Sequence, residues 1–235
     1  MNIDVFAIAF NEAEMLPHFM AHYRKFARNI TILDNESTDG TPGIAVRLGA
    51  SVRSWSSDGV QDNRVMLDQK CNCWRGCDAD YVVVVDIDEF VDCDPLPDFG
   101  AREVAFQCLG YQMIGVDNQP LEDITKFTLA AQYDKTAVFS PRIRSIGYGM
   151  GCHVASPSCP VVTDPRLILR HYMMLGEEYL LRRYRKYSVR MSESDIHNRW
   201  GWQYREPDDQ IRAVYREALA QATEEPFRHV GKEWR

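Results

Sequence analysis

Residues 81–85 read Tyr-Val-Val-Val-Val, a run that is apolar at every position. Side chains along a strand alternate between the two faces of a sheet, so both faces of this strand must be covered. Sheets that are buried on both faces are mostly the parallel sheets of α/β proteins, in which crossover helices cover each side. The run therefore predicts a central strand of a parallel sheet.

The segments before this run alternate between strand and helix patterns. A strand, a helix and a second strand in this order form a right-handed crossover that joins parallel strands. We therefore expect an α/β fold with a mostly parallel central sheet flanked by helices. Apolar residues at strand or helix spacing predict strands at 3–10, 30–33 and 51–55, and helices at 11–27, 42–50 and 61–77.

The second half of the chain is less regular. Strands are predicted at 105–116 and 136–149, and a helix at 177–190 is followed by a polar tail. The sequence shows no internal repeat or linker, and 235 residues lie at the upper end of the size of one domain. We therefore predict one domain over 1–190, with 191–235 as a helical or irregular appendage packed on it.

Composition narrows the classes of function. The formal net charge is −7, which disfavours nucleic-acid binding through bulk electrostatics. The first ten residues lack the basic region of a secretory signal, and no apolar stretch approaches the ~20 residues that span a bilayer. Seven cysteines without paired CxxC spacing predict reduced thiols rather than a zinc site. We expect a cytoplasmic protein, soluble or peripherally associated with a membrane.

The predicted helix 177–190 carries five basic residues, and three roles are open for it. It can present arginine to an anionic ligand, rest against an anionic membrane surface, or form a solvated face. The charges do not define one stripe in the sequence, so the pattern alone does not choose among these roles. The residues are Arg182, Arg183, Arg185, Lys186 and Arg190.

Polar residues follow the predicted strands where the strands end. Asn11, Asp34 and Asp86 each lie at a carboxyl end, and Asp88 and Glu89 come directly after Asp86. In parallel α/β sheets ligands bind outside the carboxyl ends of the strands. These residues should therefore converge on one crevice, although they are far apart in the sequence.

Asp86 and Asp88 are two residues apart, so their carboxylates lie on the same side of an extended chain. Mg²⁺ and Mn²⁺ prefer oxygen ligands and are commonly bound by one or two carboxylates together with phosphates. The pair therefore predicts a divalent cation, Mn²⁺ or Mg²⁺, that holds a diphosphate. The alternative is an acidic turn that caps a helix or pairs with arginine. Glu89 is expected to be a structural brace.

Two segments in this order resemble a known family. Residues 7–41, which include "NE" after the first strand and "DNESTDGT" after the second, and residues 61–91, which end in "DIDEFV", are similar to the GT-A-fold glycosyltransferases, especially family-2-like enzymes. The resemblance is close over 3–91 and looser over 105–190. It implies a metal-dependent transferase that moves a sugar from a nucleotide-diphosphate sugar to a hydroxyl acceptor, with inversion, in glycan or polysaccharide synthesis.

The resemblance also implies roles for individual residues of a donor site. Asp34 would bind the base or ribose, Arg64 or Lys70 would approach the ribose-diphosphate, and His171 would complete a metal site with Asp86 and Asp88. Asp34 could instead cap a turn, Arg64 could be solvated, and His171 could be structural. The donor-binding set is Phe10, Asn11, Glu12, Asp34, Arg64, Lys70, Asp86 and Ile87.

The base that would deprotonate the acceptor is not carried by a motif. Asp117 follows a predicted strand, and His153 lies in a glycine-flanked turn, so these two are the candidate catalytic residues. Each could instead cap a turn or brace a loop. Without a located base, inversion and retention both stay open, as do the donor nucleotide and sugar and the glycan or other acceptor.

Two alternatives to a glycosyltransferase follow from the same fold. A sugar nucleotidyltransferase would need a basic, glycine-rich loop after the first strand, and residues 11–17 are acidic and lack glycine. A non-catalytic nucleotide- or sugar-binding module, or a partner subunit, would keep the fold without needing the acid pair. Trp200 and Trp202 in the tail could stack on a sugar or pack the tail against the domain.

Overall fold

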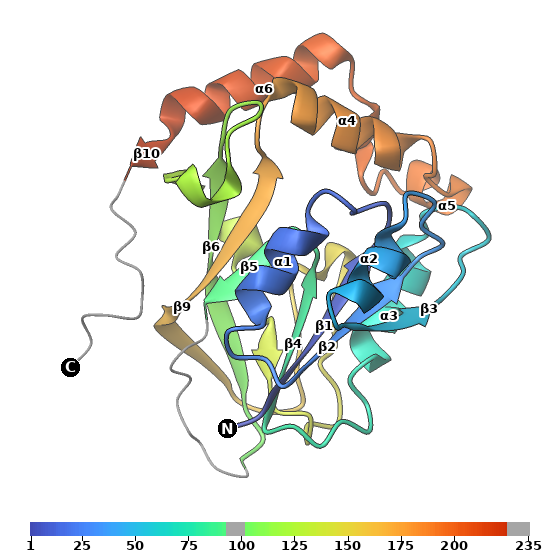
Figure 1. The fold of residues 1–235 in the computed structure, drawn as a ribbon, viewed down its shortest axis with the longest axis vertical. Coiled ribbons are helices and arrows are strands. Elements are labelled where there is room, and N and C mark those ends of the chain that lie inside the picture. The colour runs from blue at the N-terminus through green and yellow to red at the C-terminus, as the bar shows by residue number, and fades with distance from the viewer. Residues whose placement is uncertain (93–101, 225–235) are drawn as a thin grey trace.

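The computed structural model describes residues 1–92 and 102–224. Its first half contains the strands β1 (Ile3–Ala9), β2 (Asn29–Asp34), β3 (Ser51–Ser54) and β4 (Tyr81–Asp86), and the helices α1 (Leu16–Tyr23), α2 (Thr41–Arg47) and α3 (Asn63–Asn72). The four strands run parallel in the order β3-β2-β1-β4 (Figure 1). The structure therefore confirms the predicted α/β fold with helices flanking a central sheet.

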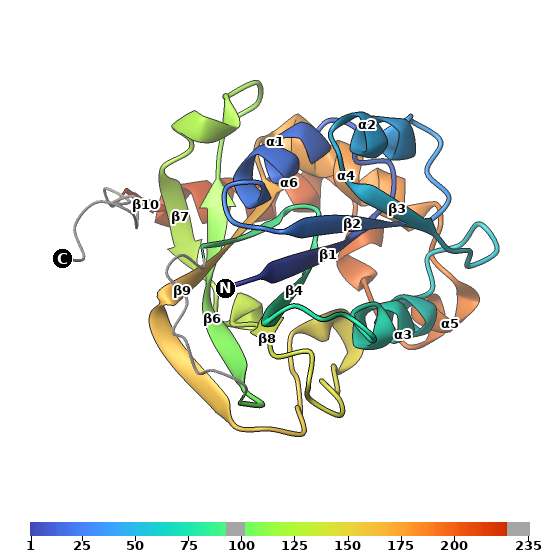
Figure 2. The ribbon, with the colours of Figure 1, turned by 60° about the horizontal axis from the view of Figure 1, so that its bottom comes forward.

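The valine strand β4 is covered on both faces, as its sequence requires. Val83 and Val85 pack in the same core cluster as Phe19 of α1, whereas Val82 and Val84 belong to a second cluster with Trp74. Figure 2 shows α1 and α2 on one side of the sheet and α3 on the other. The alternation of side chains along one strand thus joins two hydrophobic layers.

Local chemistry makes two helices shorter than their apolar patterns predict. The segment 11–15 forms a turn before α1, beginning at Asn11 with a φ of 51°. Asp62 caps α3 because its carboxylate accepts hydrogen bonds from the backbone N–H groups of Arg64 and Val65. The chain after α3 turns at Gly76, whose φ is 80°.

The second half extends the sheet with strands of both directions. It contains β5 (Glu89–Asp92), β6 (Ala105–Ile114), β7 (Lys126–Leu129), β8 (Val138–Phe139) and β9 (Val161–Met174). The short β8 pairs antiparallel with β4, β6 pairs parallel with β9, and β5 and β7 are antiparallel to their neighbours. The strand predicted at 136–149 is reduced to β8, because Pro141 and two glycines interrupt the run that follows.

The helices α4 (Glu177–Ser188) and α6 (Asp208–Gln221) lie across one end of the sheet (Figure 1). They pack together through a small apolar cluster that includes Leu180, Leu181, Ile211 and Tyr215. Between them lie α5 (Glu193–His197) and the short 3-10 helix η4 (Trp202–Arg205), and the chain ends its described part in β10 (Thr223–Glu224), which pairs with β7.

Two further observations bear on the predictions from composition. Within the described residues, no helix has the length and apolar character needed to cross a membrane. The six cysteines in the described residues are unpaired, and Cys93 lies outside them.

Three more 3-10 helices lie in the described connections: η1 (Leu121–Asp123), η2 (Ala131–Tyr133) and η3 (Met150–Cys152).

Candidate active site

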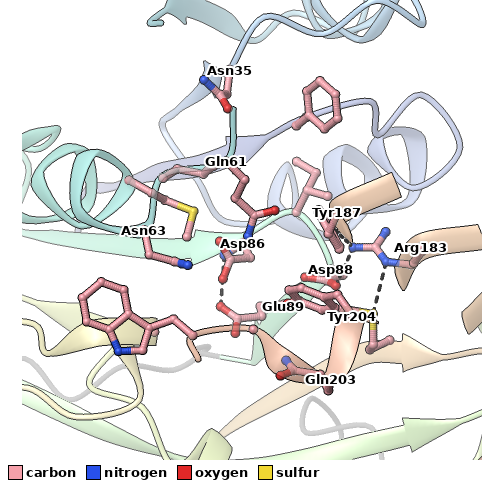
Figure 3. Close-up of a pocket in the computed structure, with 18 of the residues that line it drawn as sticks. Asn35, Gln61, Asn63, Asp86, Asp88, Glu89, Arg183, Tyr187, Gln203 and Tyr204 are labelled. Atoms are coloured by element: carbon pink, nitrogen blue, oxygen red, sulfur yellow. Dashed lines mark hydrogen bonds and ion pairs between the residues drawn. The ribbon is translucent and has the colours of Figure 1, made fainter. Parts of the chain in front are cut away.

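A pocket of about 540 Å³ opens at the carboxyl ends of β1 and β4. Turns after these strands line it, and so do side chains from α3, α4 and the segment around η4 (Figure 3). The position agrees with the expectation that ligands of a parallel sheet bind at this edge. Of the predicted site residues, the pocket is lined by Phe10, Glu12, Lys70, Asp86, Ile87, Asp88, His153 and His171.

Asp86 is held by two lysines. Its carboxylate lies 2.7 Å from the ammonium of Lys70 and 3.8 Å from that of Lys135, and both lysine side chains are buried. Burial opposes ionisation of Asp86, but the two positive charges outweigh it and keep the pKa of the carboxyl below its usual value. Asp86 is therefore ionised and already paired within the protein.

Glu89 has the bracing role that the sequence predicts. One carboxylate oxygen accepts a hydrogen bond of 3.0 Å from the backbone N–H of Asp86, and the other pairs with Lys135. Glu89 is buried, so the pairing satisfies a charge that would otherwise be costly in the interior. Glu89, the third acid of this segment, therefore holds the turn between β4 and β5 in place.

Asp88 faces a histidine and an arginine. Its Oδ2 accepts a hydrogen bond of 2.7 Å from Arg183 and lies 3.6 Å from Nε2 of His171. The side-chain amide of Gln112 donates to two carbonyls, so its Oε1 accepts from Nδ1 of His171 at 2.8 Å. Burial lowers the pKa of the imidazole despite the nearby carboxylate of Asp88, which favours the neutral ring. In the neutral ring with Nδ1 as the donor, Nε2 carries the lone pair.

This geometry fits a divalent cation at Asp88 and His171. A neutral imidazole nitrogen and a carboxylate face each other, both are acceptors, and together they are a donor set that suits Mn²⁺. Asp86 differs, because its carboxylate is taken by lysines. Within the described residues the only compact group of three metal-binding side chains lies elsewhere, at Asp4, Cys77 and Asp78.

The helix α4 turns one basic face toward this site. Arg183 bridges Asp88 and Glu12 through its two terminal nitrogens, at 2.7 Å and 2.8 Å, and Lys186 lies 2.7 Å from Glu12. Tyr187 donates a hydrogen bond of 3.1 Å to the same carboxylate. These positions follow the i, i+3, i+4 spacing of one helix face, so a stripe exists that the sequence pattern did not reveal.

The other two basic residues of α4 point away from the pocket. Arg182 is exposed and lies 3.6 Å from Glu14, and Arg185 pairs with Asp208. The fifth basic residue, Arg190, follows the helix and also faces inward. A membrane surface could therefore meet only Arg182 and Arg185 of this set, and each already has an acidic partner.

The far end of the pocket is flatter and less charged. The guanidinium of Arg190 lies 3.5 Å above the ring of Phe10 and donates a hydrogen bond of 3.0 Å to Asn35. Trp55 and Gln61 line the same end, and Gln61 points into the pocket (Figure 3). Flat rings and amides at this end offer stacking and hydrogen bonds rather than charge.

Three predicted donor-site residues lie outside this pocket. Asn11 accepts a hydrogen bond of 2.7 Å from the backbone N–H of Thr38, and Arg64 is exposed with its guanidinium 5.5 Å from the ring of Trp200. Asp34 is buried and accepts from the backbone N–H of Ser37, as in its alternative turn-capping role. The second carboxylate oxygen of Asp34 has no hydrogen-bond partner in the described part of the chain.

The structure separates the two candidate bases. Asp117 caps α4, because its two carboxylate oxygens accept from the backbone N–H groups of Glu178 and Tyr179 at 3.2 Å and 3.0 Å. Asp117 is not among the residues that line the pocket, so this geometry does not support a role as the base. The alternative capping role explains the residue instead.

His153 lines the pocket in a form suited to accept a proton. Its Nδ1 lies 2.6 Å from the carbonyl oxygen of Gln132, and since a carbonyl only accepts, Nδ1 must be the donor. Burial, together with the charge of Lys135, lowers the pKa of the imidazole, which favours the neutral ring at pH 7. In the neutral ring with Nδ1 as the donor, Nε2 carries the lone pair.

Sequence reasoning missed several residues of the pocket. Lys135 follows Asp134 and precedes the run Thr-Ala-Val-Phe at 136–139, and nothing in this local sequence marks it as a site residue. Trp200, Trp202 and Tyr204 of the predicted appendage form part of the wall, and Trp202 keeps 55% of its surface exposed. Residues after 191 therefore contribute to the site rather than only packing against the domain.

Comparisons with known proteins give fold-level likenesses only. No family model matches the chain, and no curated protein matches it. Similar solved structures include glucosyl-3-phosphoglycerate synthase from Mycobacterium tuberculosis in complex with Mn²⁺ and UDP (22% identity, TM-score 0.27, 38% of this chain and 34% of that chain). Mannosyl-3-phosphoglycerate synthase from Rubrobacter xylanophilus gives 20% identity, a TM-score of 0.32, and coverage of 46% and 41%.

A third similar structure, S. aureus TarS 1–349 in complex with UDP-GlcNAc, gives 14% identity and a TM-score of 0.43, with 92% of this chain and 71% of that chain covered. The chain spans less than half the length of the first two chains. Because all three TM-scores are below 0.5, these similarities to solved structures carry no part of the functional argument.

Proposed function

We propose that the protein is a metal-dependent glycosyltransferase that moves a sugar from a nucleotide-diphosphate sugar to an acceptor hydroxyl. The observation that carries this proposal is one pocket that combines the pair Asp88 and His171 with three buried cations. Lys70, Lys135 and Arg183 line the same pocket at the carboxyl edge of a parallel sheet. A diphosphate needs positive groups of this kind, and the family resemblance of the two motifs points the same way.

Asp88 and His171 are the residues that would hold a divalent cation, and their mixed oxygen and nitrogen donors favour Mn²⁺. When bound, such a cation acts as a Lewis acid that stabilises charge on the departing diphosphate. Lys70, Lys135 and Arg183 add fixed positive charge in a largely buried setting, where each contact is stronger than it is in water. Asp86 sets the position of Lys70 and does not need to bind the metal.

The flatter end of the pocket is the place that we assign to the nucleoside. Phe10 with the stacked Arg190 offers a planar surface, and Asn35 and Gln61 offer amide groups beside it. The pocket of about 540 Å³ is within the size range of sites for small molecules and cofactors. Neither the base nor the sugar of the donor follows from these contacts.

His153 is the base that we assign to the reaction. Its Nε2 takes the proton of the acceptor hydroxyl, while the hydroxyl oxygen forms a bond to the anomeric carbon. The bond from that carbon to the diphosphate breaks, and the electron pair leaves with the diphosphate. Direct displacement of this kind inverts the anomeric centre. A hexose as the sugar, and glycan or polysaccharide synthesis as the setting, are further parts of the proposal.

Donor turnover tests the proposal. The protein is incubated with Mn²⁺ and, in turn, UDP-glucose, UDP-N-acetylglucosamine, GDP-mannose and dTDP-rhamnose, with mono- and oligosaccharides as acceptors. The expected result is release of one nucleoside diphosphate that requires Mn²⁺ and falls in Asp88→Asn. Binding of a nucleotide with neither transfer nor hydrolysis would favour the non-catalytic binding module instead.

A further inference from the structure

Eight charged side chains around Arg183 and the turn between β4 and β5 pair with one another without any ligand. Each lysine or arginine of this cluster lies 2.8 Å or less from a carboxylate. The cluster therefore carries as many negative as positive groups. The acids are Glu12, Asp86, Asp88 and Glu89, and the bases are Lys70, Lys135, Arg183 and Lys186.

A balanced, buried cluster resists a single charged ligand. A divalent cation alone would add two positive charges beside four protein cations, and a diphosphate alone would add negative charge beside four carboxylates. Either one would leave an uncompensated charge beside charged side chains that are largely buried, which is costly. Added together, the two ligands largely cancel each other, so each should favour the binding of the other.

Arg183 lies where the two ligands would meet. The same oxygen of Asp88, Oδ2, accepts from Nη2 of Arg183 and faces Nε2 of His171. A cation bound by Asp88 and His171 would therefore compete with the guanidinium for this oxygen. One N–H of Nη2 also donates to the hydroxyl of Tyr187 at 2.9 Å, so the N–H displaced from Asp88 would need a new acceptor in a pocket that Arg183 itself lines.

We infer that Arg183 exchanges partners when the donor binds: it holds Asp88 in the free protein and binds the diphosphate once a divalent cation occupies Asp88 and His171. This inference rests on the proposed function and assigns Arg183 as a diphosphate-binding residue of that site. It also makes Arg183 the residue that couples the binding of metal and nucleotide.

The surroundings of Arg183 allow this exchange without moving the helix. Its Nη1 stays bonded to Glu12 at 2.8 Å and one N–H of Nη2 to Tyr187 at 2.9 Å, so the guanidinium is anchored while the other N–H of Nη2 changes partner. A second pocket of about 130 Å³, lined by Tyr179 and Asn11 among others, also borders Arg183 and offers open space beside it. The planar guanidinium presents paired donors that match phosphate oxygens.

Binding of each ligand alone and of both together tests the inference in the variant Arg183→Gln. Free Mn²⁺ is followed by electron paramagnetic resonance, and UDP, GDP and dTDP are titrated by calorimetry with EDTA and with Mn²⁺. We expect the variant to bind Mn²⁺ alone about tenfold more tightly than the wild type, because Asp88 is released. Nucleotide binding in Mn²⁺ should weaken about tenfold, so the coupling between the ligands should shrink.

Arg182→Gln is the matched control. Arg182 is the neighbouring arginine on the same helix, but it is exposed and pairs with Glu14 outside the main pocket. This variant should bind Mn²⁺ and nucleotide as the wild type does. A purely structural role of Arg183 would not raise the affinity for Mn²⁺, so that gain separates partner exchange from damage to the fold.

Three outcomes overturn the inference. The first is a folded Arg183→Gln whose affinity for Mn²⁺ alone is unchanged or lower. If Arg183→Gln does not fold, Arg183→Lys replaces it: its ammonium lacks the planar fork with which the guanidinium holds Glu12 and Asp88 together, so its hold on Asp88 is weaker and Mn²⁺ binding should still tighten. An unchanged affinity is the second outcome. The third is a gain in Mn²⁺ affinity with undiminished nucleotide binding. If the wild type binds none of the three nucleotides with Mn²⁺, the proposed function fails as well.

Discussion

Two acid clusters lie at opposite ends of the same parallel strands. At the amino end, Asp4 of β1 meets Cys77 and Asp78, which precede β4, and their ligand atoms all lie within 4.8 Å of one another. Arg28 pairs with Asp4 at 2.7 Å and with Asp78 at 2.6 Å. At the carboxyl end, the acids after β4 are spread over a wider cluster that lines the pocket.

Compactness alone would select the wrong end as the functional site. Asp78 has 87% of its side chain exposed to water, and none of the three residues at the amino end lines the pocket. Burial, together with a hydrogen bond to Asp4, raises the pKa of the Cys77 thiol to about 11, so it is not the thiolate that metals bind. A pocket at the carboxyl edge with buried counter-charges is therefore a stronger sign of a functional site than a compact group of acids without a pocket.

The largest difference between the two ends is expected when one carboxylate is removed from each of them. Asp88→Asn should weaken Mn²⁺-dependent nucleotide binding more than about 100-fold, because even changes in the residues that support metal ligands cost 10–100-fold. Asp78→Asn should leave it unchanged. Calorimetric titration of both variants in Mn²⁺ is the measurement, and equal losses at the two ends would refute the assignment.

His153→Gln separates chemistry from binding within the pocket. We expect kcat to fall about 100-fold, the lower range for loss of a general base, while nucleotide affinity stays the same. Because the pKa of His153 is lowered, the neutral, active form predominates above the usual value of 6.5 and is lost as the pH falls through the lower pKa of the folded protein.

The pH dependence of kcat/KM in the wild type should therefore show an acidic limb below pH 6.5, and that limb should disappear in His153→Gln. An unchanged limb in the variant would assign the titration to another group. A loss of nucleotide affinity equal to the loss of kcat would make His153 a binding residue rather than the base.

Replacing Lys135 at the carboxyl end and Arg28 at the amino end shows how strongly the burial of each ion pair affects the free energy of unfolding. Lys135→Met leaves Glu89 buried without its partner, and such a broken buried pair costs about 3 kcal/mol. The double variant Lys135→Met/Glu89→Gln should recover part of this loss. Arg28→Met should destabilise less, because its partner Asp78 is exposed and its buried partner Asp4 keeps a hydrogen bond from the side chain of Asn29. Urea unfolding with a constant m value gives the three differences.

The smallest effect is expected at Cys77. Because its thiol has a pKa of about 11, alkylation by iodoacetamide at pH 7 should be slow and should accelerate as the pH rises above 9. Mass spectrometry of the peptide that contains Cys77 gives the rate. Cys77→Ser should leave Mn²⁺ binding unchanged, and rapid alkylation at pH 7 would show that the amino end holds a reactive thiolate.

Much of the fold and part of the site could be predicted from local patterns. The valine run fixes β4 as a strand covered on both faces, and the acids after it mark the edge where the pocket lies. Glu89 could be assigned as a brace because it follows the acid pair in a turn. These features depend on residues that are close together in the sequence.

The remaining features depend on contacts between distant segments. Asp117 follows a strand as a site residue would, but its carboxylate caps a helix that begins sixty residues later, at Glu177. The basic face of α4 could not be recognised from the sequence, because the positions of the basic residues around a helix do not show which side contacts the acids. Lys135 reaches Asp86 and Glu89 only through the pairing of β8 with β4.

We propose that the carboxyl-edge cluster binds a nucleoside diphosphate together with a divalent cation. The most direct test is calorimetric titration of the wild type with UDP, GDP and dTDP, each in the presence of Mn²⁺ and in the presence of EDTA. We expect one of the three to bind tightly with Mn²⁺ and at least about tenfold more weakly with EDTA. Binding of none of them, or equal binding with and without Mn²⁺, would contradict it.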